Sequence, residues 1–397
     1  QKSKNRLLSR IMTAAVKNIS STDTPTAALN APRVLIAAGG TGGHVYPGIA
    51  IADALKELNP DMHLLFAGTR NRMEWTAVPK AGYDIKRVWI SGFHRRLTPK
   101  NLLFPVKLVT SLLQSFWIIK RFRPDLVISC GGFAAGPIGW AAAKMNIPLI
   151  LQEQNSFPGV TSRLLAGHAD FIYTAFESAA DHLPPEKIQL TGNPVRSELE
   201  NTDREQALAH FGFSDSQPVL LVLGGSGGAK GINDAVVEHL DHLHNELGLQ
   251  IIWQCGKRYI SGLSGRIDSG RLPRLRLVEF IDNMPAAYAA ADLVVSRAGA
   301  LSCSELMLTG KPSVLVPSSN VAGDHQTKNA ASMVRGGAAI LLPDNQARKQ
   351  LGPVVSSTIF DGKKLSGMSR AAAALARPDA ARVIAKEIVT LISRNHE

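Results

Sequence analysis

Two glycine-rich turns, one in each half of the chain, have the residue types that bind phosphate. Residues 39–43 follow the apolar run 34–38, and residues 224–228 follow the apolar run 219–223. Glycine lets backbone N–H groups approach a phosphate closely and lets the chain turn at once into a helix. The repeated arrangement therefore predicts an anion site at a helix start in each half.

His44 closes the first glycine turn. An imidazole at this place can neutralise the diphosphate of an acceptor, or take the proton from an attacking hydroxyl. The structural alternative is a histidine whose hydrogen bonds are satisfied within the turn. The sequence offers no better general base, so His44 is the candidate catalytic residue.

The segment 296–305 follows a predicted strand and opens a helix. Free N–H groups at a helix start can bind a diphosphate, and Glu305 can accept hydrogen bonds from ribose hydroxyls. Ser302 and Glu305 also have the S-x-x-E spacing of a capping box, which predicts a helix start at Ser302. The two roles of Glu305 are compatible, and capping alone is the alternative.

Neither turn has the dinucleotide-binding fingerprint, which needs G-x-G-x-x-G and an acid after the second strand. Val45 and Lys230 stand where the third glycine belongs, and no acid ends either second strand. The sequence also has no Walker A loop and no Asp-x-Asp metal motif. Cys130, Cys255 and Cys303 are too far apart for a CxxC pair or a zinc spacing, which indicates a reducing compartment. We expect no metal and no cofactor.

Short apolar runs alternate with helical patterns from Arg33 onward, and the alternation begins again at Pro218. This predicts parallel sheets with helices on both faces, and ligands at the carboxyl ends of the strands. Predicted strands are 34–38, 64–67, 86–90, 126–129, 149–152, 171–174, 188–190, 219–223, 251–254, 276–280, 293–296, 313–316 and 339–342. Predicted helices include 47–58, 103–122, 327–335 and 380–393.

The chain of 397 residues, 45% hydrophobic and 19% charged, is long enough for two globular domains. We expect a first domain at 32–195, a second at 196–377, and a last helix within 378–397 that returns to the first domain. Residues 1–31 are rich in Ser, Thr, Lys and Arg, which predicts a disordered leader, with a targeting peptide or an amphipathic arm as alternatives. Since the first residue is Gln1 rather than Met, the natural start is expected upstream.

Seven motifs occur in order along the chain: 39–44, 152–155, 192–196, 224–229, 279–282, 299–305 and 324–326. Together they resemble the MurG family of peptidoglycan glycosyltransferases, from Arg33 to the C-terminus. The family moves N-acetylglucosamine (GlcNAc) from UDP-GlcNAc to the C4 hydroxyl of lipid I, the lipid-linked N-acetylmuramyl (MurNAc) pentapeptide, forming lipid II. The resemblance implies a GT-B fold, two Rossmann-like domains facing a cleft, with the acceptor in the first and the donor in the second.

The resemblance assigns a set of residues to the UDP-GlcNAc site: Thr41, Gly42, Gly43, Asn155, Arg196, Ser226, Ile281, Ala300, Leu301, Ser302, Cys303, Ser304, Glu305, His325 and Gln326. It implies that Ser226 lies by the diphosphate and Ile281 beside the uracil. Two positions depart from the family, because Gly227 and His325 replace glutamines. Taken alone, Arg196 could equally form a structural ion pair, and Gln326 could be a solvated helix start.

The formal net charge of +12 favours acidic partners. Residues 85–123 mix aromatic and basic side chains; Trp117 and Ile118 are expected in the core, and the loop after the third strand is expected to be exposed. Apolar and basic residues together predict peripheral contact with an anionic membrane; nucleic acid is the competitor, but no nucleic-acid motif occurs. No apolar run reaches the roughly 20 residues that span a bilayer. The candidate membrane contact is Phe93, Arg95, Arg96, Leu97 and Lys100.

We therefore expect an inverting glycosyltransferase on the cytoplasmic face of the plasma membrane, with UDP-GlcNAc and lipid I as substrates and other cell-wall proteins as candidate partners. The enzymatic alternatives are another GT-B glycosyltransferase or a UDP-GlcNAc 2-epimerase. The non-enzymatic alternative is a regulatory module that binds a nucleotide sugar without turnover. Product analysis separates the enzymes from one another, and donor binding without UDP release would support the regulatory module.

Overall fold

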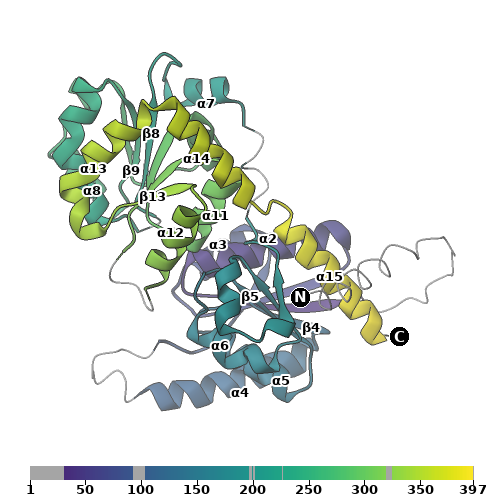
Figure 1. Ribbon diagram of the computed structural model, residues 1–397. Coiled ribbons are helices and arrows are strands. Elements are labelled where there is room, and N and C mark those ends of the chain that lie inside the picture. The colour runs from purple at the N-terminus through teal and green to yellow at the C-terminus, as the bar shows by residue number, and fades with distance from the viewer. Residues whose placement is uncertain are drawn as a thin grey trace, which may run out of the picture.

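The structure is a computed structural model that describes residues 31–92, 103–195, 199, 202–225, 227–318 and 324–396. These residues fold into two α/β domains, each built on one parallel sheet with helices on both faces (Figure 1). The predicted fold class is confirmed. Residues 1–30, most of the expected leader, lie outside the described residues, so the expectation for them stays a prediction.

The first domain contains a parallel sheet of strand order β3-β2-β1-β4-β5-β6-β7. Its strands are β1 (Arg33–Ala37), β2 (His63–Gly68), β3 (Asp84–Arg87), β4 (Leu126–Ser129), β5 (Leu149–Glu153), β6 (Phe171–Thr174) and β7 (Ile188–Leu190). Its helices are α2 (Gly42–Leu58), α3 (Glu74–Lys80), α4 (Phe104–Phe122), α5 (Ala135–Lys144) and α6 (Val160–Leu165). Side chains alternate across β1, so Val34 and Ile36 enter one apolar cluster and Leu35 and Ala37 the other.

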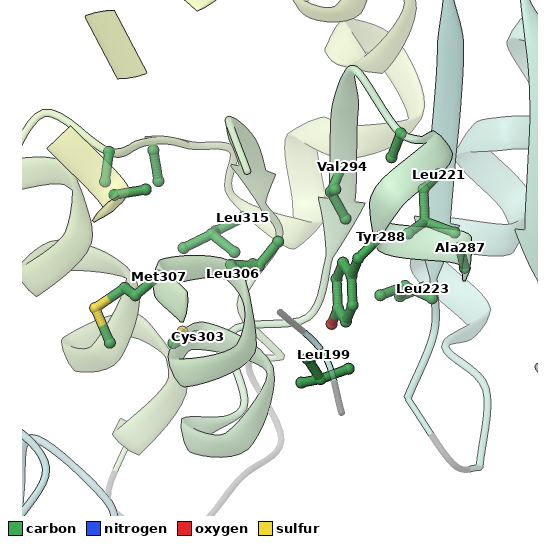
Figure 2. Packing of buried hydrophobic residues seen from close by; sticks show 14 of the residues in the cluster. Leu199, Leu221, Leu223, Ala287, Tyr288, Val294, Cys303, Leu306, Met307 and Leu315 are labelled. Carbon is green, nitrogen blue, oxygen red and sulfur yellow. The ribbon is translucent and has the colours of Figure 1, made fainter. Parts of the chain in front are cut away.

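The second domain contains a parallel sheet of strand order β10-β9-β8-β11-β12-β13. Its strands are β8 (Val219–Leu223), β9 (Gln250–Gln254), β10 (Leu275–Val278), β11 (Leu293–Ser296), β12 (Ser313–Leu315) and β13 (Ala339–Leu341). Its helices are α7 (Arg204–Phe211), α8 (Lys230–Asp241), α9 (Ile260–Ser264), α10 (Met284–Ala290), α11 (Ala300–Leu308), α12 (His325–Arg335), α13 (Asp344–Ile359) and α14 (Gly362–Leu375). Figure 2 shows Tyr288 of α10 near Leu199 and Val294 in one of its two apolar clusters.

Both glycine turns lie where the strand order reverses. The first follows β1, whose neighbours are β2 and β4, and the second follows β8, whose neighbours are β9 and β11. Ligands of open α/β sheets bind in the crevice at such a reversal, outside the carboxyl ends of the strands. The topology therefore puts each turn at the expected binding edge of its sheet.

The last helix, α15 (Ala380–His396), leaves the second domain and packs against α2 of the first (Figure 1). Ile384, Ile388 and Ile392 are buried in the same apolar cluster as β1. The hydroxyl of Tyr173 on β6 donates a hydrogen bond of 2.5 Å to Glu387. The first domain is therefore completed by the C-terminal end of the chain.

Several helices begin earlier than the sequence pattern predicts. α2 starts at Gly42 rather than Pro47, because a proline near a helix start removes only one backbone hydrogen bond. Thr41 is the exposed N-cap of α2, so Gly42 and Gly43 are its first helical residues. The early start puts the predicted binding turn and the first turn of α2 in direct succession.

Candidate active site

His44 lies in the first turn of α2. Its Nδ1 is 3.1 Å from the carbonyl oxygen of Gly39 and 3.1 Å from the hydroxyl oxygen of Thr41. A carbonyl oxygen only accepts hydrogen bonds, so we assign the proton to Nδ1 and leave Nε2 as a proton acceptor. Burial lowers the pKa of His44, against the opposing effects of the Glu153 charge and the Gly39 carbonyl. The imidazole is therefore neutral near pH 7, as a general base must be.

A buried carboxylate, Glu74, ties the first glycine turn to the loop after β2. Its Oε2 accepts a hydrogen bond of 3.0 Å from the backbone N–H of Gly40. Its Oε1 accepts bonds of 3.0 and 2.6 Å from the backbone N–H and the hydroxyl of Thr69. Glu74 was not predicted from the sequence, where its one signal is an acid directly after a loop with two arginines.

Two glycines after β4 make room for the turn. Gly131 and Gly132 have φ angles of +94° and +86°, which disfavour any other residue. A Cβ atom at Gly131 would lie 2.8 Å from Cδ2 of His44, and one at Gly132 would lie 2.0 Å from the carbonyl oxygen of Gly39. The position of the imidazole therefore depends on glycine at both places, and this role of the pair was not predicted from the sequence.

Glu153, the last residue of β5, organises the loop that reaches the second domain. Its carboxylate accepts hydrogen bonds from the backbone and side-chain nitrogens of Asn155, at 2.9 and 3.1 Å, and from the hydroxyl of Ser162, at 2.6 Å. Its negative charge acts on the pKa values of both His44 and His325. The charge of one buried carboxylate in the first domain thus raises the pKa of one histidine in each domain.

Asn329 of α12 joins the two domains. Its Oδ1 accepts a hydrogen bond of 2.9 Å from the backbone N–H of Ser156, and its Nδ2 donates one of 3.2 Å to the carbonyl of Ala298. The same Nδ2 is 3.5 Å from Oδ1 of Asn155. Asn155 therefore lies at the domain interface, beside the loop that begins α11. Asn329 was missed because a buried asparagine inside a helix has no sequence signature.

The start of α12 faces the same interface. Nζ of Lys328 lies 3.3 Å from the ring centre of Phe157, and the ring of His325 lies 5.8 Å from it. Nδ1 of His325 is buried without a hydrogen-bond partner among the described residues, and burial lowers the pKa of this histidine. Gln326 accepts a hydrogen bond of 2.8 Å from the backbone N–H of Ser318. Both predicted residues thus belong to the first turn of α12, not to a loop before it.

The predicted capping box is wrong. α11 begins at Ala300, its N-cap is Gly299, and no side chain caps it, so Ser302 and Glu305 lie inside the helix. Glycine accepts the extended N-cap conformation and alanine is the best helix former, which together favour the earlier start. The first N–H groups of α11 have no intrahelical partner and lie where the second sheet reverses its order.

Several side chains of the predicted segment 300–305 are engaged within the protein. The hydroxyl of Tyr288 donates a hydrogen bond of 2.9 Å to Glu305, and that of Ser304 donates one of 3.0 Å to the carbonyl of Ala300. Cys303 is fully buried, and burial raises the pKa of its thiol to about 12. Three side chains of the segment are partly exposed: Leu301, Ser302 and Glu305.

The remaining residues assigned by the resemblance differ in what they can offer. The Ile281 side chain is buried in the apolar core of the second domain, so only its backbone is available to a base. The second glycine turn is held by Gln254, whose amide donates a hydrogen bond of 2.9 Å to the carbonyl of Gly225. Arg196 and Ser226 lie outside the described residues, and their roles stay predictions.

The predicted membrane loop also lies outside the described residues: Phe93, Arg95, Arg96, Leu97 and Lys100.

The next helix, α4, presents large exposed apolar side chains at spacings of three and four residues, which put them on one face. They are Val106, Val109, Leu113 and Trp117, preceded by Leu103 at the N-cap. The expectation that Trp117 is in the core is wrong, since it is 61% exposed, whereas its neighbour Ile118 is buried. No helix in the described ranges is long and apolar enough to cross a membrane.

Two parallel-sheet domains, with a glycine-rich turn at the reversal of each sheet, are the architecture of the GT-B class. The chain belongs to glycosyltransferase family 28. Residues 34–174 match the model of the N-terminal domain of this family, and residues 219–384 match that of its C-terminal domain.

Curated relatives match nearly the whole chain. One from Salinibacter ruber is 45% identical over 364 residues, which cover 92% of this chain and 98% of the relative. One from Bacteroides fragilis is 46% identical over 369 residues, which cover 92% and 97%. Both are named UDP-N-acetylglucosamine–N-acetylmuramyl-(pentapeptide) pyrophosphoryl-undecaprenol N-acetylglucosamine transferase. The resemblance drawn from the seven motifs is confirmed.

Solved structures agree with this assignment. The crystal structure of Acinetobacter baumannii MurG is 26% identical with a TM-score of 0.72, and the match covers 91% of this chain and 99% of that chain. A UDP-GlcNAc 2-epimerase from Neisseria meningitidis, bound to UDP-GlcNAc, has a TM-score of 0.64 at 14% identity, covering 90% and 100%. At that identity the epimerase shares the fold alone, so it does not support the epimerase alternative.

Proposed function

We propose that this chain transfers GlcNAc from UDP-GlcNAc to the C4 hydroxyl of undecaprenyl-pyrophosphoryl-MurNAc-pentapeptide. The observation that carries the proposal is the 45% identity, over 92% of the chain, to an enzyme named for this reaction. The acceptor oxygen attacks the anomeric carbon from the face opposite UDP. The bond to the UDP oxygen breaks with its electron pair, so an α-linked donor gives a β-1,4 linkage.

In this mechanism Nε2 of His44 accepts the proton of the attacking hydroxyl. Its Nδ1–H points to the carbonyl of Gly39, 3.1 Å away, which fixes the ring so that Nε2 is the free base. The absence of a side chain at Gly131 leaves room for this ring position, since a Cβ there would lie 2.8 Å from Cδ2 of His44. The role of the first glycine turn is therefore to present a neutral imidazole to the acceptor.

The second domain stabilises the charge of the departing UDP. The unpaired N–H groups at the start of α11 form the positive end of the helix dipole. They lie where the strand order of the second sheet reverses, which is the place proposed here for the diphosphate of UDP. Glu305 accepts hydrogen bonds from the ribose hydroxyls. Asn155, His325 and Gln326 contact the sugar from the interface.

Wild-type protein with UDP-GlcNAc and a soluble lipid I analogue should release UDP in step with formation of the β-1,4-linked disaccharide. Omission of the acceptor should suppress UDP release. Turnover should continue in EDTA, because backbone dipoles supply the positive charge. The measurement is coupled UDP release with mass analysis of the product. UDP-ManNAc as product, or donor binding without release, would reject the transferase, and dependence on added Mg²⁺ would reject the dipole mechanism.

Glu305→Gln should raise the KM for UDP-GlcNAc about tenfold, because hydrogen bonds from two ribose hydroxyls would lose their charge assistance. Thermal stability should change little, since the amide oxygen still accepts the bond from Tyr288. The matched control is Tyr288→Phe, which removes that internal bond and keeps the carboxylate. It should lower Tm and leave the KM for UDP-GlcNAc nearly unchanged. An unchanged donor KM in Glu305→Gln would leave this residue a structural role only.

We also propose that the protein docks on an anionic membrane through the exposed face of α4 and the segment 93–100, which the sequence predicts to be an exposed loop. The acceptor carries a long lipid, so its pyrophosphoryl sugar must be taken from the headgroup layer. The α4 face supplies apolar area, and Arg121 lies 5.8 Å from the Trp117 ring. Exposed apolar side chains beside basic ones are typical of peripheral membrane contacts.

Arg95→Glu/Arg96→Glu/Lys100→Glu should reduce binding to anionic vesicles by roughly two orders of magnitude, because each basic residue contributes about 1 kcal/mol near the surface. Leu113→Glu/Trp117→Glu should weaken binding to anionic and neutral vesicles alike. Sedimentation with both vesicle types measures this, and salt should reverse only the charge-dependent part. Phe360→Glu, an exposed apolar position of the second domain, is the control. Equal binding of all variants would reject this surface.

A further inference from the structure

A cavity of about 490 Å³ opens beside the first glycine turn, at the carboxyl ends of β2 and β3. Arg70 and Arg72 line it from the loop after β2, Arg87 and Trp89 from the end of β3, and Phe133 from the loop after β4. It lies on the same edge of the sheet as His44, since β2 is the neighbour of β1. Nothing described above uses this cavity, which we call the arginine pocket.

The arginine pocket is strongly cationic. Arg70, Arg72 and Arg87 are exposed, and among the described residues no carboxylate lies within ion-pair distance of any of them. The pocket lining itself contains no acidic residue. Three guanidinium groups around one cavity, without an internal counterion, favour an anionic ligand with several oxygens, because arginine binds phosphate with paired donors.

The walls of the pocket are held in place by buried and partly buried polar groups. Glu74 binds the backbone and hydroxyl of Thr69 at the base of the loop that carries two of the arginines. The backbone N–H of Trp89 donates a hydrogen bond of 2.7 Å to Gln114 of α4, and Lys107 of α4 donates one of 3.0 Å to Ser91. The pocket is therefore preorganised and joined directly to α4.

A second cavity connects the arginine pocket with the catalytic turn. Gly40 and Thr41 line it on one side, and Asn71 and Arg72 line both cavities. Neighbouring strands lie about 4.8 Å apart, so the ends of β1 and β3 are separated by about 10 Å. That is the length scale of a hexose that carries a diphosphate. The two cavities thus lead from Gly40 and Thr41, in the turn that His44 closes, past Arg72 to Arg87.

We propose that the arginine pocket binds the diphosphate of the acceptor, an inference that rests on the transferase function proposed above. With the C4 hydroxyl of the acceptor at His44, the C1 substituent is at the opposite end of the sugar ring, along this path. Beyond the pocket lie Lys107 and the exposed apolar face of α4, which suits the lipid that follows the diphosphate. The peptide is attached next to C4, so it leaves the path nearer the catalytic turn.

The test is a double variant, Arg70→Gln/Arg87→Gln, assayed for UDP release with a short-chain lipid I analogue. We expect its acceptor KM to rise at least tenfold, with the KM for UDP-GlcNAc unchanged, because each lost arginine removes a charge-assisted contact. The matched control is Lys86→Gln, which removes a positive charge from the neighbouring position on β3, where side chains point to the opposite face. The control should keep the wild-type acceptor KM, and Tm values should show that both variants are folded.

Two further arms identify the ligand. Inorganic pyrophosphate should compete with the acceptor in wild type and at least tenfold more weakly in the double variant. An acceptor analogue without its peptide should show the same ratio of variant to wild-type KM. If the ratio of variant to wild-type KM is near one on that analogue, the pocket binds peptide carboxylates and the proposal is wrong. Equal acceptor KM values for the double variant and Lys86→Gln would also overturn the proposal. Absence of turnover in wild type would instead reject the transferase function.

Discussion

Replacing His44 with alanine should lower kcat by about 10²–10⁴-fold, the usual contribution of a general base, and should leave the KM for UDP-GlcNAc nearly unchanged. The expected loss is selective because His44 belongs to the first domain, whereas the proposed diphosphate and ribose contacts belong to the second. His44→Asn is the informative companion variant. Its amide can still donate to the Gly39 carbonyl but has no basic nitrogen.

The pH profile gives a second measure of the same role. Burial lowers the pKa of His44 below its ordinary value of 6.5, so the neutral, basic form persists at pH values where an exposed histidine is already charged. The acid limb of kcat/KM should therefore fall below pH 6.5 and disappear in His44→Ala. Stability should also fall as the pH drops below 6.5, because the unfolded chain takes up this proton first. A wild-type kcat in His44→Asn would contradict the general-base role and show that His44 only supports the structure of the turn.

Replacing Gly132 with alanine should abolish most activity and lower Tm by about 5–10 °C, since strain and overpacking together cost about 2–4 kcal/mol. The new Cβ would lie 2.0 Å from the carbonyl oxygen of Gly39, a backbone atom that has to move. That carbonyl accepts the hydrogen bond of His44, so the imidazole is displaced with it. The kinetic signature should be that of His44→Ala, with a kcat loss larger than any change in donor KM.

Gly82→Ala is the matched control for this prediction. Gly82 has a φ of +85°, close to the +86° of Gly132, but a Cβ there would meet no atom within 4 Å. It should therefore cost about 1 kcal/mol from the backbone alone, or about 2–4 °C in Tm, with kcat unchanged. Circular dichroism melts measure the Tm of both variants, and steady-state kinetics measure their kcat. Equal kcat values would show that Gly132 does not position His44.

The sequence predicts strands better than helix starts. A buried parallel strand is a continuous apolar run bounded by polar residues, so β4, β6, β8 and β11 have the predicted bounds. Helix starts depend on backbone conformation at one residue. Gly299 caps α11 without a side chain, and Pro47 is tolerated inside α2, so both helices begin before the residues that carry the usual signals.

The same contrast applies to the candidate site. The glycine turns and His44 could be found because close backbone approach leaves a local pattern. Glu74, Glu153 and Asn329 could not, because no spacing rule identifies their partners. Glu74 and Glu153 bind backbone and hydroxyl groups of irregular loops, and Asn329 binds Ser156, which lies 173 residues away. The exposure of Trp117 was missed for a related reason. An apolar helix face has the same sequence whether a core or a membrane covers it.

The return of α15 to the first domain has a consequence for how the chain folds during synthesis. The part of α2 that packs against α15 is covered only when Ile384, Ile388 and Ile392 have left the ribosome. At about 5–20 residues per second, the roughly 190 residues between β7 and α15 take about 10–40 s to synthesise. During that interval the nascent first domain carries an open hydrophobic surface while the second domain folds. The N-terminal half therefore matures last, and cells short of chaperones should lose it to aggregation before they lose the C-terminal half.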